Sequence, residues 1–173
     1  KGQARIMDAA DAPKAIADVA GAPSVLEGFV DFSHEVSVIA ARGQAGDVSC
    51  FEPDENVHTD SILHTTTFPD NFTAYQRVDA LLLAAKILNE LEYVGVMGVE
   101  LFVTKQGLVV NEIAPRVHNS GHWTQNGCVI DQFEQHIRAV VGWPLGDGKR
   151  HSNVEMLNLI GDDVDRIPEF AKD

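Results

Sequence analysis

Two carboxylates, Glu100 and Glu112, occupy facing positions of a predicted β-hairpin and could do chemistry as a pair. The apolar–polar alternation on both sides of Gly107 predicts two strands joined by a three-residue loop, with Gly107 in the left-handed conformation. That closure pairs Thr104 with Leu108, and counting back along both strands sets Glu100 opposite Glu112. Their Cβ atoms would then lie roughly 5 Å apart on one face of the sheet.

Like charges this close repel each other unless a cation lies between them. Carboxylate oxygens on rigid strands suit Mg²⁺, which takes one or two carboxylates together with the phosphates of a nucleotide. The alternative is a solvated sheet face on which two acidic residues happen to oppose each other, since exposed glutamates are common.

A polar loop follows the hairpin directly and adds further reactive side chains. It carries Arg116, His118, Asn119, Ser120 and His122 within seven residues. Few structural roles need so many such side chains after the end of a strand, and loops held by rigid strands are where chemistry concentrates. The loop therefore favours a functional reading of the carboxylate pair.

The segment NEIAPRVHNSGHWTQNG resembles the signature of the 5-(carboxyamino)imidazole ribonucleotide synthases, ATP-grasp enzymes of purine biosynthesis. The segments EGFVDFSHEVSVI, the one around His58, and LNLIG follow the order of the same family. The resemblance implies an α+β ATP-grasp domain, an antiparallel sheet with packed helices, over residues 1–160. Residues 161–173 would begin a C-terminal segment.

The resemblance also implies a reaction: ATP- and bicarbonate-dependent carboxylation of 5-aminoimidazole ribonucleotide through carboxyphosphate, with ATP and Mg²⁺ required. Glu100 and Glu112 would bind the metal. Arg116, His118 and Asn119 would be the catalytic residues that form a pocket for bicarbonate or carboxyphosphate. Ala114 occupies a place where many ATP-grasp relatives have a metal-binding Asn, which leaves the ligands of a second metal ion open.

The nucleotide would be bound by several segments. Glu27–Val30 resembles the linker that contacts adenine through its backbone, and Glu35 would accept hydrogen bonds from the ribose hydroxyls. His58 would lie near the nucleotide. The expected nucleotide-binding residues are Lys1, Gly2, Gln3, Glu27, Gly28, Phe29, Val30, Glu35, His58, Asn111 and Glu112.

Lys1-Gly2-Gln3 resembles the end of a glycine-rich phosphate loop, so the chain is expected to start within that loop and to lack N- and C-terminal portions of the family. Two alternatives stay open: an inactive, truncated nucleotide-binding domain, or another ATP-grasp carboxylate–amine ligase. The family also implies a homodimer, and a functional link to the mutase that takes its product.

Composition sets outer limits on the function. The chain has 173 residues, 45% of them hydrophobic, which is enough for one globular core, and no apolar run long enough to span a membrane. A formal net charge of −13 argues against a nucleic-acid-binding surface. Cys50 and Cys128 stand far apart in the sequence and favour reduced thiols in a cytoplasmic protein.

Helices and strands must position these residues, and their patterns predict a run of strands interrupted by one long helix. The helix over 72–91, begun by Pro69-Asp70-Asn71, is expected to pack on the sheet through Val78, Leu81, Leu82, Ala85, Leu88 and Leu91. The other expected elements are helices over 11–20 and 132–141, strands over 24–30, 32–41, 63–68 and 153–160, a turn plus strand over 43–51, and a polar loop over 54–62.

Overall fold

The computed structural model describes residues 3–59, 61–68 and 72–170, and the chain divides into two compact units, Lys1–Val30 and Asp31–Asp173. In the first unit, the expected helix is present as a 3₁₀ turn, η1 (Ala9–Asp11), followed by α1 (Ala12–Asp18). The Asp8 side chain caps this start, because it accepts a hydrogen bond from the Ala10 N–H.

The prediction of a strand over residues 24–30 is wrong. These residues form neither strand nor helix, and Val25 and Leu26 are each 85% exposed. A strand is held by hydrogen bonds to a neighbouring strand, and no ladder partner for this segment occurs in the described part of the chain. Its apolar composition alone therefore does not make it a strand.

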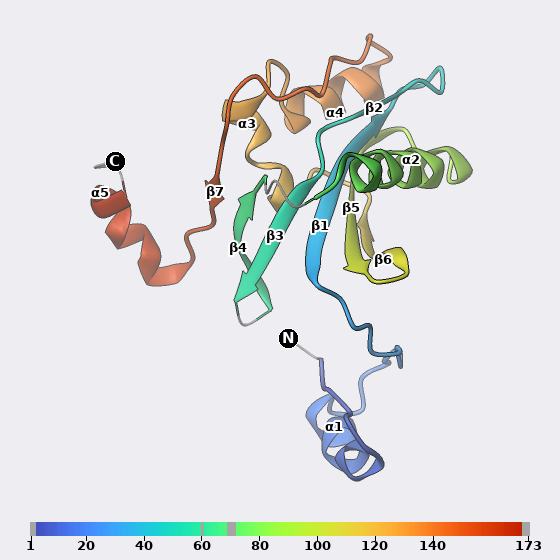
Figure 1. Ribbon diagram of the computed structural model, residues 1–173, viewed down its shortest axis with the longest axis vertical. Coiled ribbons are helices and arrows are strands. Elements are labelled where there is room, and N and C mark those ends of the chain that lie inside the picture. Colours follow the sequence, from blue (N-terminus) through green and yellow to red (C-terminus); the bar gives the residue numbers. More distant parts are fainter. Residues whose placement is uncertain (1–2, 60, 69–71, 171–173) are drawn as a thin grey trace. The chain divides into compact units, whose positions relative to one another are not determined.

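One antiparallel sheet forms the centre of the second unit, in the order β6-β5-β1-β3-β4-β7, with β2 also paired to β1 (Figure 1). This arrangement confirms the predicted α+β class. The strands are β1 (His34–Arg42), β2 (Val48–Cys50), β3 (Asp54–Thr59), β4 (Ile62–Thr67), β5 (Gly95–Thr104), β6 (Gly107–Ala114) and β7 (Met156–Leu157).

Both faces of the central strands are covered, which explains why β1 is buried from Val36 to Ala41. Helix α2 (Ala74–Glu90) packs against one face, over a core that includes Val38, Val99 and Leu101. The second face carries another core around Ile39, Phe51 and Trp123. On that side lie η2 (Asn119–Gly121), α3 (Thr124–Gly127) and α4 (Gln132–Val141).

Helix α2 packs on the sheet as predicted, and Leu81 and Leu88 of the predicted stripe face the core, but the rest of the stripe is different. The residues that it buries fully are Ala80, Ala84 and Leu88, whereas Val78 and Leu82 are more than half exposed. The small alanine side chains let the helix approach the sheet closely. Because Leu81, Leu82 and Leu83 follow one another, the spacing of leucines cannot show which side of the helix faces inward. The predicted cap at residues 69–71 lies outside the described residues, and the Thr73 side chain caps the helix.

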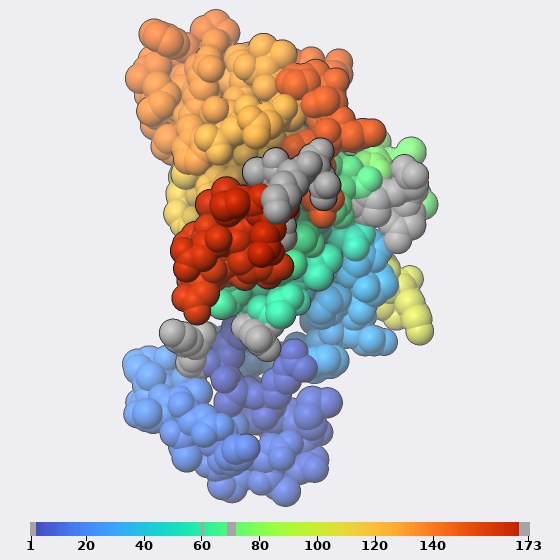
Figure 2. All heavy atoms as spheres, turned by 90° about the vertical axis from the view of Figure 1, so that its left-hand side faces the viewer, coloured from blue at the N-terminus to red at the C-terminus, as the bar shows by residue number. Residues whose placement is uncertain are grey.

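The segment 54–62 was expected to be a polar loop, but most of it is strand β3, paired between β1 and β4. Asp54 and Asn56 of this strand are buried among hydrogen-bond partners instead of facing water. The expected strand over 153–160 is reduced to the two residues of β7. Beyond β7, the C-terminal segment with η3 (Gly161–Arg166) and α5 (Ile167–Phe170) lies on the outer side of β4 (red in Figure 2).

The β5–β6 hairpin confirms the pairing of Glu100 with Glu112 but not the predicted loop. Thr104 pairs with Gly107, so the loop has two residues and not three. That register alone would set Glu100 opposite Asn111. A β-bulge next to Glu100 inserts one extra residue in β6 and restores the opposition of the two carboxylates.

Among the described residues, no helix is both long enough and apolar enough to cross a membrane.

Candidate active site

A row of polar side chains crosses four neighbouring strands on the face opposite α2. The strand registers align Asp54 of β3 with Ser37 of β1, Ser37 with Glu100 of β5, and Glu100 with Glu112 of β6. Residues directly opposite each other in a sheet share a face. Four neighbouring strands therefore place Glu100, Glu112, the Ser37 hydroxyl and the buried Asp54 in one line.

The pKa of Glu100 reflects its burial and its closeness to other negative charges. Burial, together with the charges of Glu112 and Glu35, raises the pKa of Glu100 to about 7, against the lowering effect of a hydrogen bond from Asn111. The Asn111 Nδ2 atom lies 3.4 Å from Glu100 Oε2. A half-buried carboxylate that faces two others is suited to a cation.

The residues present fit Mg²⁺ if a nucleotide completes its coordination. No group of three or more His, Cys, Asp or Glu side chains gathers as metal ligands in the described ranges. Glu100 and Glu112 are only two carboxylates, but Mg²⁺ is commonly bound by one or two carboxylates with substrate phosphates and water. The donor set thus suits a nucleotide-bound Mg²⁺ better than a closed protein cage.

His118 is held beside this pair at the start of η2. Its Nε2 atom lies 3.7 Å from Glu100 Oε1, and its Nδ1 atom lies 2.9 Å from Ser120 Oγ. Burial lowers the pKa of His118, and the positive charge of Arg116 lowers it further. Both effects favour the neutral imidazole, which has one protonated and one unprotonated ring nitrogen.

Two residues that the sequence analysis missed fix the backbone and ring of His118. The Gln132 side chain accepts from the His118 N–H at 2.9 Å and donates to its C=O at 2.8 Å. Gly98 of β5 leaves room for the ring, since a Cβ atom there would lie 2.8 Å from His118 Cβ. No sequence signal distinguishes this buried glutamine from an ordinary polar residue at the start of a helix.

The other predicted residues of the second unit divide into two groups. Glu35 and His58 meet on the same face, with Glu35 Oε2 3.1 Å from His58 Nδ1 and both side chains about one-fifth exposed. Arg116 is exposed, and its Nη1 donates to the C=O of Val117 at 2.8 Å. Asn119 is half-buried at the start of η2, next to His118.

A buried polar cluster forms around Asp54 at the β3 end of the row, and sequence reasoning did not find it. Asp54 accepts hydrogen bonds from Trp123 Nε1 at 2.8 Å, from Ser37 Oγ at 2.5 Å and from Asn56 Nδ2 at 3.0 Å. Burial outweighs the lowering effect of these hydrogen bonds and leaves the pKa of Asp54 raised to about 7. Thr66 Oγ1 donates to Asn56 Oδ1 at 2.8 Å and extends the cluster to β4.

Comparison with known proteins decides the family. Residues 1–133 match the ATP-grasp domain family. The chain belongs to the ATP-grasp family. The antiparallel sheet with helices packed on it is the architecture expected for an ATP-grasp domain.

Within this family, the chain is similar to the N5-carboxyaminoimidazole ribonucleotide synthases. It is 54% identical over 171 residues to the one from Brucella melitensis, covering 97% of this chain and 47% of that protein. The crystal structure of the synthetase from Thermus thermophilus superposes with a TM-score of 0.83 at 40% identity, over 88% of this chain and 43% of that one. The chain thus spans about half the length of the relatives it matches.

A fungal structure in the same group was solved with ligands bound. The N5-carboxyaminoimidazole synthase from Aspergillus clavatus, in complex with ADP and 5-aminoimidazole ribonucleotide, superposes with a TM-score of 0.92 at 31% identity. The superposition covers 97% of this chain and 46% of the Aspergillus clavatus chain.

The remaining predicted nucleotide-binding residues of this ATP-grasp chain belong to the first unit. Lys1 and Gly2 lie outside the described residues, and Gln3 is exposed. Glu27, Gly28 and Phe29 are exposed, and Val30 is half-buried. Their contact with a nucleotide stays a prediction, because the first unit is described by itself.

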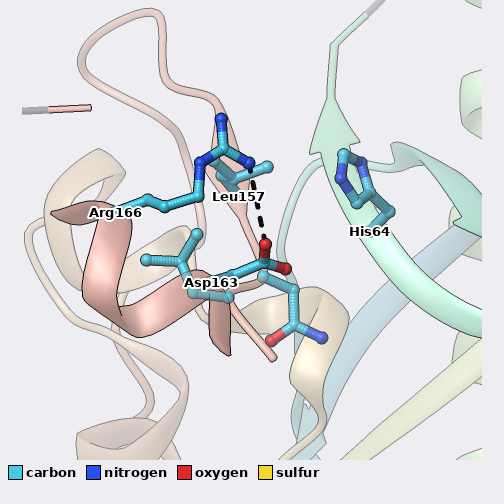
Figure 3. Close-up of a pocket in the computed structure, with 6 residues that line it drawn as sticks. His64, Leu157, Asp163 and Arg166 are labelled. Atoms are coloured by element: carbon cyan, nitrogen blue, oxygen red, sulfur yellow. Dashed lines mark ion pairs between the residues drawn. The ribbon is translucent and has the colours of Figure 1, made fainter. Parts of the chain in front are cut away.

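A hollow of about 250 Å³ lies elsewhere on the ATP-grasp chain, between β4, β7 and η3 (Figure 3). His64 lines it from β4, and Asp163 and Arg166, whose charged groups are 3.8 Å apart, line it from η3. None of its lining residues is a predicted site residue. The hollow therefore gives no reason to move the candidate site from the carboxylate row.

Proposed function

We propose that this chain is the nucleotide-binding part of an ATP-dependent ligase that carboxylates 5-aminoimidazole ribonucleotide. The observation that carries the proposal is the row of Glu100 and Glu112 with His118 beside it, in a chain similar to N5-carboxyaminoimidazole ribonucleotide synthases over nearly its whole length. The row supplies a place for the charged phosphates of ATP, and the adjoining loop supplies groups for a second, smaller anion.

In the proposed reaction, bicarbonate attacks the γ-phosphate of ATP to give carboxyphosphate and ADP. Such phosphoryl transfers depend mainly on positioning and on stabilising charge. Glu100 and Glu112 would hold Mg²⁺, with Asn111 orienting Glu100 through its carboxamide. When bound, the metal ion neutralises the phosphate oxygens.

The loop after β6 would hold the bicarbonate and the carboxyphosphate. Arg116 offers a planar fork of donors that fits a carboxylate or phosphate in a bidentate way, and its exposure leaves it accessible to a ligand. His118 and Asn119 follow within three residues and complete the pocket. The CO₂ released from carboxyphosphate would then bond to the exocyclic amine of 5-aminoimidazole ribonucleotide.

The nucleoside part of ATP would lie along the same face toward Glu35 and His58. The carboxylate of Glu35 accepts hydrogen bonds, which suits two ribose hydroxyls. The backbone of residues 27–30 would pair with the adenine edge, and Lys1, Gly2 and Gln3 would lie over the phosphates. These roles are inferred from the resemblance of those segments to the family.

The experiment that tests the proposal uses the full-length protein that contains this sequence. Phosphate release and carboxylated product are measured together with ATP, Mg²⁺, bicarbonate and 5-aminoimidazole ribonucleotide. We expect both products in equal amounts, with each substrate required. Efficient turnover with a different amine and none with 5-aminoimidazole ribonucleotide would assign the chain to another ATP-grasp carboxylate–amine ligase.

A further inference from the structure

A continuous chain of hydrogen-bonding side chains links the buried Asp54 to His118. Ser37 Oγ contacts Asp54 Oδ1, and it lies 2.8 Å from Ser120 Oγ. Ser120 Oγ in turn lies 2.9 Å from His118 Nδ1. Asp54, Ser37 and Ser120 are fully buried and His118 is 9% exposed, so water does not compete for these contacts.

The partners of Asp54 set the direction of this chain. The indole nitrogen of Trp123 can only donate, and so can Nδ2 of Asn56, whose Oδ1 accepts from Thr66. Above its raised pKa of about 7, the carboxyl group of Asp54 is ionised and is an acceptor only, stabilised by the several donors around it. Ser37 therefore gives its single hydroxyl hydrogen to Asp54.

The positions of the remaining hydrogens follow from the number of hydrogens that each group carries. Because a hydroxyl group carries one hydrogen, Ser37 must accept a hydrogen bond from Ser120. Ser120 has then used its own hydrogen, so it must accept from His118 Nδ1. The Nδ1 atom of His118 thus carries a proton, and in the neutral ring the Nε2 atom that faces Glu100 carries none.

We propose that Asp54 is a positioning residue that acts through Ser37 and Ser120 to hold His118 as the Nδ1-protonated tautomer. The unprotonated Nε2 then faces the carboxylate row. The catalytic meaning rests on the proposed function. As the amine nitrogen of the substrate bonds to the carbon of CO₂, its N–H bond breaks, and Nε2 is oriented to accept that proton.

The test reads the tautomer directly by NMR, without substrates. The ¹⁵N-labelled 173-residue chain is measured at about pH 8, where Asp54 is ionised, by correlating ring nitrogens with ring carbon-bound hydrogens. The His118 signals are assigned by their loss in His118→Asn. We expect the Nδ1 shift of a protonated nitrogen and the Nε2 shift of an unprotonated one; the opposite pattern would overturn the proposal.

The Asp54→Asn variant should reverse the direction of donation along this series of hydrogen bonds. The Asn oxygen stays with the Trp123 donor, so its NH₂ group points to Ser37 and to Asn56, whose carboxamide must turn so that its oxygen accepts. Ser37 then accepts from the new NH₂ group and must donate to Ser120. Ser120 in turn donates to His118 Nδ1, and the proton moves to Nε2. A folded Asp54→Asn variant that keeps the wild-type tautomer would refute the positioning role.

Two further variants keep the test decisive. Thr66→Val keeps the shape of the side chain and removes only the contact at the far side of Asn56, so it should leave the tautomer unchanged. Ser37→Ala interrupts the chain itself and should give a mixture of tautomers, whether or not Asp54→Asn folds. An unmixed wild-type pattern in Ser37→Ala contradicts the proposal, and so does a tautomer change in Thr66→Val.

The proposed tautomer and the proposed function can be refuted independently of each other. If His118 shows the expected tautomer but the full-length protein does not carboxylate the amine, the proposed function is wrong and the positioning of His118 stands. Normal carboxylation with an Nε2-protonated His118 would leave the function in place and exclude the role of Asp54.

Discussion

Glu112 opposes Glu100 directly, so one substitution should have opposite effects on stability and on function. Glu112→Gln keeps the shape of the side chain and removes one of two facing charges. Without ligand, we expect the variant to be more stable by about 0.2–1 kcal/mol, because like charges directly opposite each other destabilise a sheet. Binding of Mg²⁺–ATP should weaken at least tenfold, and turnover should be lost.

Urea denaturation and calorimetric titration measure these two effects. Glu90→Gln, at the end of α2, removes one charge away from the row and serves as the matched control, with both quantities unchanged. Unchanged Mg²⁺–ATP affinity in Glu112→Gln would reduce the pair to two acidic residues on a solvated sheet face.

Asp54 should make stability depend on pH. Its pKa is raised from an ordinary 3.8 to about 7 by burial, so the folded chain holds a proton that the unfolded chain has released. The contribution to stability is fully present below about pH 4 and is lost as the pH rises through about 7.

The comparison of wild type with Asp54→Asn isolates this contribution. The wild-type free energy of unfolding, relative to that of the variant, should fall by on the order of 2–3 kcal/mol between about pH 5 and pH 8. Other carboxylates titrate alike in both proteins and cancel. Urea denaturation at the two pH values measures the difference, and a difference independent of pH would show that burial does not raise this pKa.

At the scale of elements, strand β5 must approach η2 closely for His118 to reach Glu100. Gly98→Ala would place a Cβ atom 2.8 Å from His118 Cβ and 2.9 Å from its Cγ. We expect the ring to be pushed away from Glu100 and Ser120, a loss of stability of about 1–3 kcal/mol, and loss of turnover in the full-length protein.

Val99→Ala provides the control for Gly98→Ala, because the neighbouring side chain points to the other face, into the core beneath α2. It should also cost stability, but it should leave the NMR signals of the His118 ring unchanged. If Gly98→Ala left those signals unchanged too, the close approach of β5 and η2 would not position His118.

The hairpin shows how far the sequence predicts such elements. Alternation of apolar and polar residues identified both strands and the pairing of Glu100 with Glu112. The predicted loop was one residue too long because Gly107 was placed inside it, whereas Gly107 pairs with Thr104. The bulge compensated for that error. A single extra residue shifts the alternation by one position, but the apolar run Leu108-Val109-Val110 hides such a shift in the sequence.

Segment 54–59 was missed for a different physical reason. Its polar residues look like a loop because their hydrogen-bond partners are distant in sequence: Asp54 meets Trp123, and Ser37 meets Ser120. Local pattern can predict which side chains are polar but not whether a partner will bury them. The sequence pattern predicted residues that could carry chemistry, but it gave no sign of those that support them, such as Gln132.

At the scale of the whole molecule, one face of the sheet in the second unit is covered along its core, and the other is covered only in part and carries the candidate site. Helix α2 closes the first with a continuous core. On the second, the core around Trp123 ends at the row of Ser37, Glu100 and Glu112, where Glu112 and Arg116 are exposed. A reaction through carboxyphosphate requires more protection from water than this, because excluding water prevents hydrolysis of reactive intermediates.

We therefore predict that the 173-residue chain alone binds Mg²⁺–nucleotide weakly and does not carboxylate 5-aminoimidazole ribonucleotide. It spans 47% of the relative from Brucella melitensis, and the remaining half of such a protein is available to cover the acceptor and the phosphates. Phosphate release and carboxylated product are measured for the chain and for that full-length relative under the same conditions. We expect nucleotide binding by both proteins but product from the relative only. Product from the chain at a comparable rate would mean that the exposed row and its loop suffice to protect the intermediate.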